Sequence, residues 1–537
     1  MTRVADTVAR SLAAAGVRHA FGMPGGEVVT LIDALAEARI RFVLARHETA
    51  AAIMGAGAAT VTGAPGLLVT TLGPGLANAV NGIADAAQER MPLLVVSGVV
   101  ERSIRARYTH QILDHAALLR PLVKASFEIE PEGAAAIVAR AVALATTPPC
   151  GPVHLDLAPN VAATAVPPGP PLWQTPIVAT PAPDPSDPGI AAVRERLAAA
   201  DRPLLLAGFE AARGGAAPAL VRLAEHHGMP VLTTYKAKGV IDEHHPLALG
   251  AAGLSPAADR ILLDVVRRAD LLLLAGYDPI EMRPGWLDPF AATSEVIELT
   301  ACPPDHAMHS VDRRLLGPVA PLLAALLTDG PRRPGWPNQG LARTRSRLAE
   351  LYVRSEAWDA TAIIATLNEA LPEQAIVTVD SGAHRILLSQ MWRARRPLTL
   401  LQSAGFCTMA AALPLAIGAK IGRPRQPVVA VLGDGGLEMG LGELGTLRDQ
   451  GLPVVLVVLQ DGSLGLIELK QRQAGLARIG VGLGRTDLAA VARAFGGRGV
   501  TAGSEAELKA ALAEALAAAT FTLIACPIDL ESYVDRL

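Results

Sequence analysis

The sequence predicts an α/β protein of three domains, each a mostly parallel sheet flanked by helices. At 537 residues the chain is longer than one ordinary hydrophobic core can serve. Hydrophobic residues make up 51% of it and aromatic residues only 3%, so small aliphatic side chains must fill the interior, as they do where helices cover both faces of a parallel sheet. Short apolar runs also alternate with helical stretches along the whole length.

The order of these runs divides the chain into domains at 1–165, 188–332 and 355–537. The first contains "RFVLARHE", "GLLVTTLGPG", "PLLVVSG" and "GPVHLDLAPN". A proline-rich stretch at 166–187 cannot hold a helix or a central strand and predicts a linker. The second domain contains "RPLLLAGFEA" and "ADLLLLAGYDP", and the Pro/Gly/Arg-rich start of 333–354 predicts another linker. The third contains "QAIVTVDSG", "QPVVAVLGDGG" and "LPVVLVVLQDG".

Composition excludes several classes of protein. A net charge of -3 and 18% charged residues argue against a disordered chain and against a nucleic-acid partner. The four cysteines lie far apart, so neither a disulfide framework nor a zinc site is indicated, and a reducing cytoplasm is expected. The amphipathic start carries Arg10 and Arg18, unlike a signal peptide, and no apolar run approaches the roughly 20 residues of a membrane span.

Two aspartates close neighbouring apolar runs in the third domain. Asp434 lies in the Gly-Asp-Gly that ends "PVVAVLGDGG", and Asp461 follows "LPVVLVVLQ". In a βαβ unit the two strands are parallel, so their carboxyl ends, where such sheets bind ligands, lie side by side. Two carboxylates beside glycine-rich backbone suit Mg2+ bridging to a phosphate group. Alternatively, each aspartate by itself could be an ordinary turn residue.

The stretch resembles the metal-binding motif of thiamine-diphosphate (ThDP) enzymes, with Gln460-Asp461 in place of the usual closing Asn-Asn or Asn-Asp. The resemblance implies ThDP and Mg2+ as cofactors, held between a pyrimidine-binding and a diphosphate-binding domain that flank a central domain. The metal ligands it implies are Asp434, Asp461 and the main-chain carbonyl of Ser463. Gly433, Gly435 and Gly436 would let the diphosphate approach the main chain.

The same resemblance extends to other motifs. Glu48, in "LARHETAAA", would relay a proton to the aminopyrimidine ring, and a buried position would raise the pKa of a glutamate as such a role requires. By itself a His-Glu pair is more often a solvated strand end. The further cofactor contacts that the resemblance implies are Pro24, Gly25, Asn78, Gly382, His384, Cys407, Met409 and Leu466. Without it, His384 is a partly buried histidine in a turn and Met409 an ordinary core residue.

Within these enzymes the chain resembles acetolactate synthases, above all the catabolic, flavin-independent branch. The segment "RARYTHQILDHAALLRPLVKASF" carries this likeness and implies that His110 and Gln111 face the reacting carbons, although both could belong to a plain surface loop. "LLLLAGYDPIEMRPGWLD" lacks the Arg-Phe-Asp-Asp-Arg signature of FAD-containing synthases, so FAD is not expected. Cys407, where a glutamine is usual, and Lys470 depart from the pattern.

Three functions follow. The first is a ThDP- and Mg2+-dependent carboligase that decarboxylates pyruvate and joins it to a second 2-oxo acid, with Glu48, Gln111 and His110 as catalytic residues. The second is a ThDP-dependent 2-oxo acid decarboxylase, or a C–C lyase or hydrolase on another ketone, favoured by Cys407 and Lys470. The third is a non-catalytic ThDP-binding protein, against which the intact Glu48, Asp434 and Asp461 argue. The family places the cofactor between two subunits, so a homodimer is the minimum, and a dimer of dimers fits closed symmetry.

Overall fold

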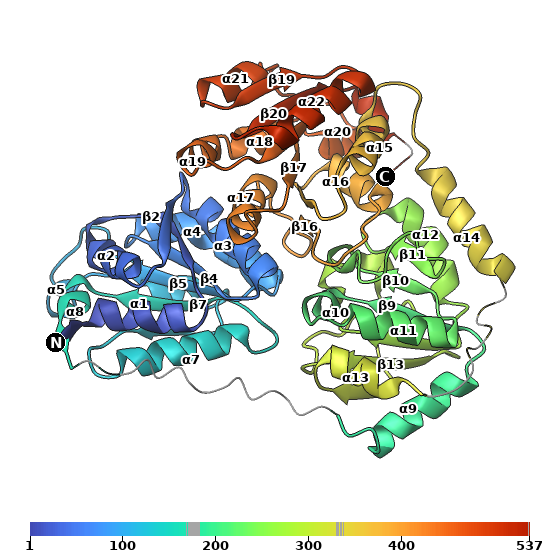
Figure 1. Cartoon of the computed structure of the whole chain (residues 1–537), viewed down its shortest axis with the longest axis horizontal. Coiled ribbons are helices and arrows are strands. Elements are labelled where there is room, and N and C mark those ends of the chain that lie inside the picture. Colours follow the sequence, from blue (N-terminus) through green and yellow to red (C-terminus); the bar gives the residue numbers. More distant parts are fainter. Residues whose placement is uncertain are drawn as a thin grey trace.

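The computed structural model describes residues 1–167, 169, 183–328, 332, 334, 336, 338–534 and 536. It contains three sheets of six strands, each covered by helices on both faces (Figure 1). Every strand pair within these sheets is parallel. The predicted fold class, three α/β domains with parallel sheets, is confirmed.

The N-terminal domain lies at the left of Figure 1. Its strands, in spatial order, are β3 (Arg41–Leu44), β2 (His19–Met23), β4 (Gly66–Thr70), β5 (Leu93–Gly98), β7 (Val153–Leu157) and β6 (Ser126–Glu128). Its main helices are α1 (Val4–Ala14), α2 (Val29–Glu37), α3 (Glu48–Thr62), α4 (Pro74–Gln88), α6 (His115–Leu119) and α7 (Ala134–Thr146). A small antiparallel pair, β1 (Thr2–Arg3) and β8 (Ala165–Val166), joins the two ends of the domain.

The central domain has the strand order of dinucleotide-binding folds, in which the third, second and first strands along the chain precede the fourth, fifth and sixth. Its strands are β11 (Ala248–Ala251), β10 (Val231–Thr233), β9 (Pro203–Ala207), β12 (Leu271–Ala275), β13 (Glu295–Thr300) and β14 (Arg313–Leu316). Its main helices are α9 (Pro188–Ala199), α10 (Phe209–Arg213), α11 (Ala217–His227), α12 (Pro256–Val266) and α13 (Val319–Leu326). A pocket of about 730 Å³ opens at the carboxyl ends of β9 and β12, against the N-terminal domain.

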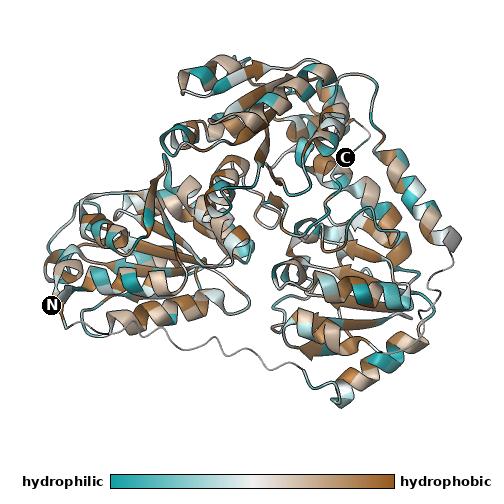
Figure 2. Cartoon of the chain, in the orientation of Figure 1, coloured by the Kyte–Doolittle hydropathy of each residue, from teal (hydrophilic) through white to brown (hydrophobic). Residues whose placement is uncertain are grey.

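The C-terminal domain repeats the strand order of the N-terminal one. Its strands are β16 (Leu400–Gln402), β15 (Ile376–Val379), β17 (Val428–Gly433), β18 (Val455–Gln460), β20 (Thr522–Pro527) and β19 (Arg498–Thr501). Its main helices are α15 (Ala360–Ala370), α16 (Ala383–Met391), α17 (Ala412–Gly422), α18 (Asp434–Met439), α19 (Glu443–Asp449), α20 (Gly465–Gln473), α21 (Leu488–Ala494) and α22 (Glu505–Ala517). In Figure 2 the strands at the centre of each domain are mostly brown, that is, hydrophobic. Strand residues that are covered by helices on both faces of the sheet must be apolar throughout.

Helices α3 and α17 join the N-terminal and C-terminal domains. They pack closely because glycines face the partner backbone: a Cβ on Gly418 would lie 2.1 Å from the Met54 carbonyl oxygen, and one on Gly57 would lie 2.7 Å from that of Leu415. This contact belongs to the largest buried apolar cluster, which contains residues of both domains.

The sequence predicts two linkers, at 166–187 and 333–354. Most of 166–187 lies outside the described residues. Within 333–354, Asn338–Leu351 forms helix α14, and its Leu341 and Leu348 pack on the central domain's core. The proline- and arginine-rich start of this segment predicted a linker and gave no sign of the amphipathic helix that follows it. A search of the described residues for a helix long and apolar enough to cross a membrane finds none.

Candidate active site

Two aspartates stand at the carboxyl edge of the C-terminal sheet. Asp434 follows β17 as the first residue of α18, and Asp461 follows β18, the parallel neighbour of β17. The Gly462 N–H donates to Asp434 Oδ2 at 2.8 Å, and the Ser463 N–H donates to Asp461 Oδ1 at 3.0 Å. The structure therefore brings together the three residues that the sequence predicts as metal ligands.

The side chains around these two aspartates create an excess of negative charge that a cation could balance. Burial raises the pKa of Asp434, and burial together with the charge of Asp434 raises the pKa of Asp461 to about 7. The other side chains whose charges act on the pair are Glu438 and Glu468, both acidic. Across the described ranges, neither aspartate forms an ion pair with a basic side chain. A divalent cation with oxygen ligands would relieve this repulsion, so the residues fit Mg2+.

The Ser463 hydroxyl is already engaged. It donates to Glu468 Oε2 at 2.6 Å, and Glu468 also accepts from Arg478 Nε at 2.8 Å. The atom of Ser463 that could serve a metal is therefore its main-chain carbonyl, as the resemblance implies.

His384 lies beside the Asp434 turn in the first turn of α16. A Cβ on Gly382 would lie 2.7 Å from its Cε1, and one on Gly433 would lie 3.3 Å from the same atom, so glycine at both positions makes room for the ring. Burial, followed by the charge of Arg385, lowers the pKa of His384 to about 3, which keeps the ring neutral. Its buried Nε2 has no hydrogen-bond partner among the described residues, so this atom is left free for a group bound beside the Asp434 turn.

Asp380 holds the loop next to the same region through hydrogen bonds to its backbone. It directly follows β15, is fully buried, and accepts the N–H groups of Ala410 and Ala411 at 3.0 and 2.9 Å. Burial raises its pKa to about 6 although these hydrogen bonds oppose the change. A Cβ on Gly436 would lie 1.9 Å from Asp380 Oδ2, so position 436 accepts only glycine while Asp380 keeps its place.

The loop 403–411 brings Met409 to the Asp434 turn. The Met409 Cε lies 3.9 Å from where a Cβ on Gly435 would stand. Cys407, at a φ of +59°, accepts from both terminal nitrogens of Arg385 at 3.3 Å. Leu466 is half-buried and packs against the core of the same domain.

Glu48 lies at the other end of the predicted site, as the first residue of α3. It is 4% exposed and accepts from Asn78 Nδ2 on α4 at 3.1 Å. The two residues before it are tied to the C-terminal domain, because Glu443 Oε1 accepts the N–H groups of Arg46 and His47 at 2.9 and 3.0 Å. The carboxylate is therefore held at a defined place by contacts on both sides.

The remaining predicted residues of the N-terminal domain are more open. Pro24 is exposed and Gly25 half-buried after β2, where a Cβ on Gly25 would lie 2.1 Å from the Thr71 hydroxyl. His110 and Gln111 are exposed on the loop before α6, and Gln111 has a φ of +57°. These residues and Glu48 form one group and those around Asp434 another, each in its own domain.

Comparisons with known proteins place these groups in a family. Three models of thiamine pyrophosphate enzymes match the chain: the N-terminal TPP-binding domain at residues 2–118, the central domain at 190–326 and the C-terminal TPP-binding domain at 380–526. A probable acetolactate synthase large subunit of Methanocaldococcus jannaschii is 30% identical over 95% of this chain and 89% of its own length. The chain belongs to the acetolactate synthase family of ThDP enzymes.

Other members of the family resemble the chain to a similar degree. The acetolactate synthase of Bacillus subtilis is 29% identical over 100% of this chain and 94% of its own length. The catabolic acetolactate synthase of Raoultella terrigena is 28% identical over 98% of this chain and 95% of its own length. This ThDP enzyme is thus a carboligase of the acetolactate synthase type, as the sequence predicts.

Several residues that support the site of this ThDP enzyme were missed in the sequence. Asp380 and Glu443 bond backbone groups next to Met409 and Glu48, and Asp85 accepts from the Ser403 hydroxyl at 2.5 Å. Asp380 stands directly after an apolar run, as Asp434 does, so the same strand-end rule could have found it. Nothing in the local sequence distinguishes Glu443 or Asp85 from the exposed acids of other helices.

Proposed function

We propose that this enzyme requires Mg2+, decarboxylates pyruvate and joins the resulting two-carbon unit to a second 2-oxo acid. The observation that carries the proposal is the meeting of buried Asp434 and half-buried Asp461 at adjoining strand ends, in a chain that also buries Glu48 against Asn78. A metal site and a proton-transferring glutamate are the two parts that activation of ThDP requires of the protein.

The chain's own residues would divide the work as follows. Asp434, Asp461 and the Ser463 carbonyl would hold Mg2+, whose remaining positions are left for diphosphate oxygens and water. His384 would line the diphosphate site, and Met409 would press on the cofactor from the side of Gly435. When bound, ThDP supplies the carbon nucleophile and the electron sink for decarboxylation. Glu48, oriented by Asn78, would exchange a proton with the aminopyrimidine ring.

The acceptor would meet the loop before α6. His110 and Gln111 are exposed there and carry hydrogen-bonding groups, which supports contact with the second 2-oxo acid. Gln111 packs against the start of α4, because a Cβ on Gly73 would lie 2.6 Å from the Gln111 carbonyl oxygen. The loop thus adjoins the helix that carries Asn78.

The active enzyme would be at least a homodimer, with Glu48 of one chain facing Asp434 and Asp461 of another, and a dimer of dimers would complete a tetramer. Exposed apolar side chains near both groups support such an interface; among them are Ile104, Tyr108, Ile112, Leu113, Met439, Ile467, Leu476 and Ile479. Mixing inactive Glu48→Gln and Asp461→Asn chains would restore about a quarter of wild-type activity, since half of random dimers carry one intact site. Mixed chains that stay inactive would place the whole site within one subunit.

We also propose that the enzyme works without FAD and in the cytoplasm. Glu210 lies in the first βα turn of the central domain, the position where such folds bind the diphosphate of a dinucleotide. A carboxylate at this position would repel the diphosphate of FAD, which supports the first part of the proposal. The Glu210 carboxylate accepts from Ala301 N at 2.7 Å and from the Thr300 hydroxyl at 3.0 Å. A purified protein with flavin absorbance would contradict the first part. All four cysteines are free thiols, which supports a reducing compartment.

A second candidate function is decarboxylation that releases an aldehyde. The contact that favours it is Cys407 with Arg385, because a thiol that accepts from a buried guanidinium stands where catabolic acetolactate synthases usually have a glutamine. A changed pocket wall could alter what captures the two-carbon unit.

One experiment separates these functions. The purified protein is incubated with ThDP, Mg2+ and 13C-labelled pyruvate, and the products are identified by NMR, with Glu48→Gln as the control. Acetolactate supports the carboligase, and acetaldehyde supports the decarboxylase. Bound ThDP without consumption of pyruvate or any other 2-oxo acid would contradict both and favour a non-catalytic ThDP-binding protein.

A further inference from the structure

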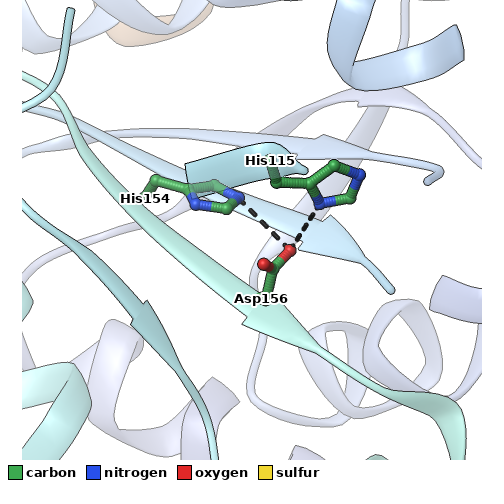
Figure 3. A group of neighbouring side chains, drawn as sticks. All are labelled: His115, His154 and Asp156. Atoms are coloured by element: carbon green, nitrogen blue, oxygen red, sulfur yellow. Dashed lines mark hydrogen bonds and ion pairs between the residues drawn. The ribbon is translucent and has the colours of Figure 1, made fainter. Parts of the chain in front are cut away.

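Three polar side chains gather inside the N-terminal domain, outside the residues assigned above. His154 and Asp156 lie two positions apart on β7 and so face the same side of the sheet, where His115 of α6 meets them (Figure 3). Asp156 Oδ1 is 2.7 Å from His115 Nδ1 and 3.4 Å from His154 Nε2. Both histidines are buried. Over the described residues, this is the one group of three such side chains spaced closely enough to hold a metal ion.

The hydrogen bonds around His115 define its protonation. The Gly73 N–H donates to His115 Nε2 at 3.3 Å, so Nε2 carries the lone pair and Nδ1 carries the proton that is donated to Asp156. Burial alone would raise the pKa of Asp156, but hydrogen bonds from the two histidines outweigh it and lower the pKa to about 2, so the acceptor is a carboxylate. His154 Nε2 also lies 3.2 Å from the Ser97 hydroxyl.

This pattern argues against a metal. A metal ion on His115 Nδ1 would move the ring proton to Nε2, where it would face the Gly73 N–H, and two donors cannot bond each other. The ring is therefore a hydrogen-bonded link between Asp156 and Gly73.

Gly73 connects this link to the proposed site. It precedes α4, and its carbonyl accepts the Ala77 N–H at 2.9 Å in the first turn of that helix. Its φ is +53°, and a Cβ there would lie 2.6 Å from the Gln111 carbonyl oxygen. One turn further along α4, Asn78 donates to Glu48.

We propose that His115, aligned by Asp156, is a positioning residue that fixes the start of α4 and the loop carrying Gln111, and through Asn78 the orientation of Glu48. The proposal rests on the proposed function, in which Glu48 transfers a proton. His115 itself touches neither cofactor nor substrate in this scheme.

Two substitutions of His115 separate its hydrogen bonds from its bulk. His115→Gln keeps an amide N–H for Asp156 and a carbonyl oxygen for Gly73, whereas His115→Phe keeps the ring and loses both. We expect His115→Phe to lower kcat about tenfold, equivalent to about 1.4 kcal/mol in the barrier, with KM for pyruvate changed less than about twofold. His115→Gln should stay within about threefold of the wild type.

A second measurement does not depend on turnover. Amide hydrogen exchange of residues 73 and 75–77 in the protein without cofactor should accelerate about tenfold in His115→Phe and return to the wild-type rate in His115→Gln. His244→Phe is the matched control, because it breaks an exposed pair, His244 Nδ1 to Asp242 Oδ1 at 2.9 Å, in the central domain. Should His115→Phe not fold, Asp156→Ala takes its place, since it removes the carboxylate that accepts the Nδ1 proton of His115.

The outcomes are distinct. Equal kcat and equal exchange in His115→Phe and the wild type would overturn the proposal, as would equal losses in the Gln and Phe variants. Stoichiometric Zn2+ binding by the wild type that His115→Phe abolishes would overturn the assigned protonation. If the wild type consumes no 2-oxo acid, the proposed function fails, while hydrogen exchange still decides whether His115 holds the start of α4.

Discussion

Replacing Asp380 with asparagine should make the protein more stable relative to the wild type as the pH rises. The Asp380 carboxyl is fully buried, and burial raises its pKa from an ordinary value of 3.8 to about 6. Below pH 4 both the folded and unfolded states hold the proton, and above pH 6 both have lost it, so folding then has to bury a charge. The stability contributed by the protonated group is therefore lost between pH 4 and pH 6.

The magnitude follows from the pKa difference. A pKa higher by about two corresponds to about 3 kcal/mol of unfolding free energy, of which about 2.5 kcal/mol falls between pH 4 and pH 8. Asparagine does not titrate, so the variant escapes this loss. It still offers one oxygen to the Ala411 N–H but turns an NH2 group toward that of Ala410, which costs a hydrogen bond at every pH. The test is therefore how the difference in unfolding free energy between variant and wild type changes with pH, and not the size of that difference at one pH.

The assay is urea unfolding followed by circular dichroism from pH 4 to pH 8 in EDTA, for the wild type and Asp380→Asn. Subtracting one curve from the other cancels the titration of all other groups. Asp487→Asn is the control, because Asp487 is an exposed carboxylate that also caps a helix of this domain, accepting the Ala490 N–H at 2.9 Å. A flat difference across the range, or one that falls as pH rises, would refute the argument that burial dominates at Asp380.

Three further predictions concern activity, metal binding and the domain interface. Glu48→Gln should lower kcat about a hundredfold with ThDP still bound, measured by steady-state kinetics, and an unchanged kcat would remove Glu48 from the mechanism. Mg2+ with ThDP should raise the melting temperature more at pH 8 than at pH 5. The reason is that the pKa of Asp461 is about 7, so protons compete with the metal for this carboxylate at low pH. Equal increases at the two pH values, measured by calorimetry, would contradict this prediction. Gly418→Ala should lower the free energy of unfolding by about 2–3 kcal/mol, because it forces a Cβ to 2.1 Å from the Met54 carbonyl oxygen. The control Gly26→Ala places its Cβ in open space and should lower it much less. Equal melting temperatures of the two variants would contradict this prediction.

Much of the fold could be predicted because its strands are buried on both faces. A run such as 428–433, "VVAVLG", must be apolar throughout when helices cover both sides, and that leaves a clear mark in the sequence. The juxtaposition of Asp434 and Asp461 was predictable for a related reason. Parallel strands place their carboxyl ends at one edge, so residues that follow two neighbouring strands must meet.

The supporting contacts were not predictable because they join segments far apart in the sequence. Glu443 accepts from Arg46 across 397 positions, and Asp85 accepts from Ser403 across 318. A polar residue on a helix gives no local sign of whether it faces water or another domain. The helix α14 was missed for the opposite reason, since the Pro-, Gly- and Arg-rich stretch that precedes it pointed to a linker.

The shared strand order of the N-terminal and C-terminal domains gives the two groups of the proposed site equivalent places in their sheets. In both sheets the third strand along the chain ends in a glycine-rich turn and a helix: Gly73 and Pro74 begin α4, and Gly433 and Asp434 begin α18. At the second turn Asp434 offers a carboxylate, the proposed metal ligand, whereas at the first turn Pro74 begins a helix that presents Asn78 to Glu48 one turn later. In the proposed function, the first position of the helix would therefore serve the Mg2+ site in one domain and Glu48 in the other. On this argument, a substitution that shifts the start of α4, such as His115→Phe, should disturb proton transfer and leave Mg2+ affinity intact.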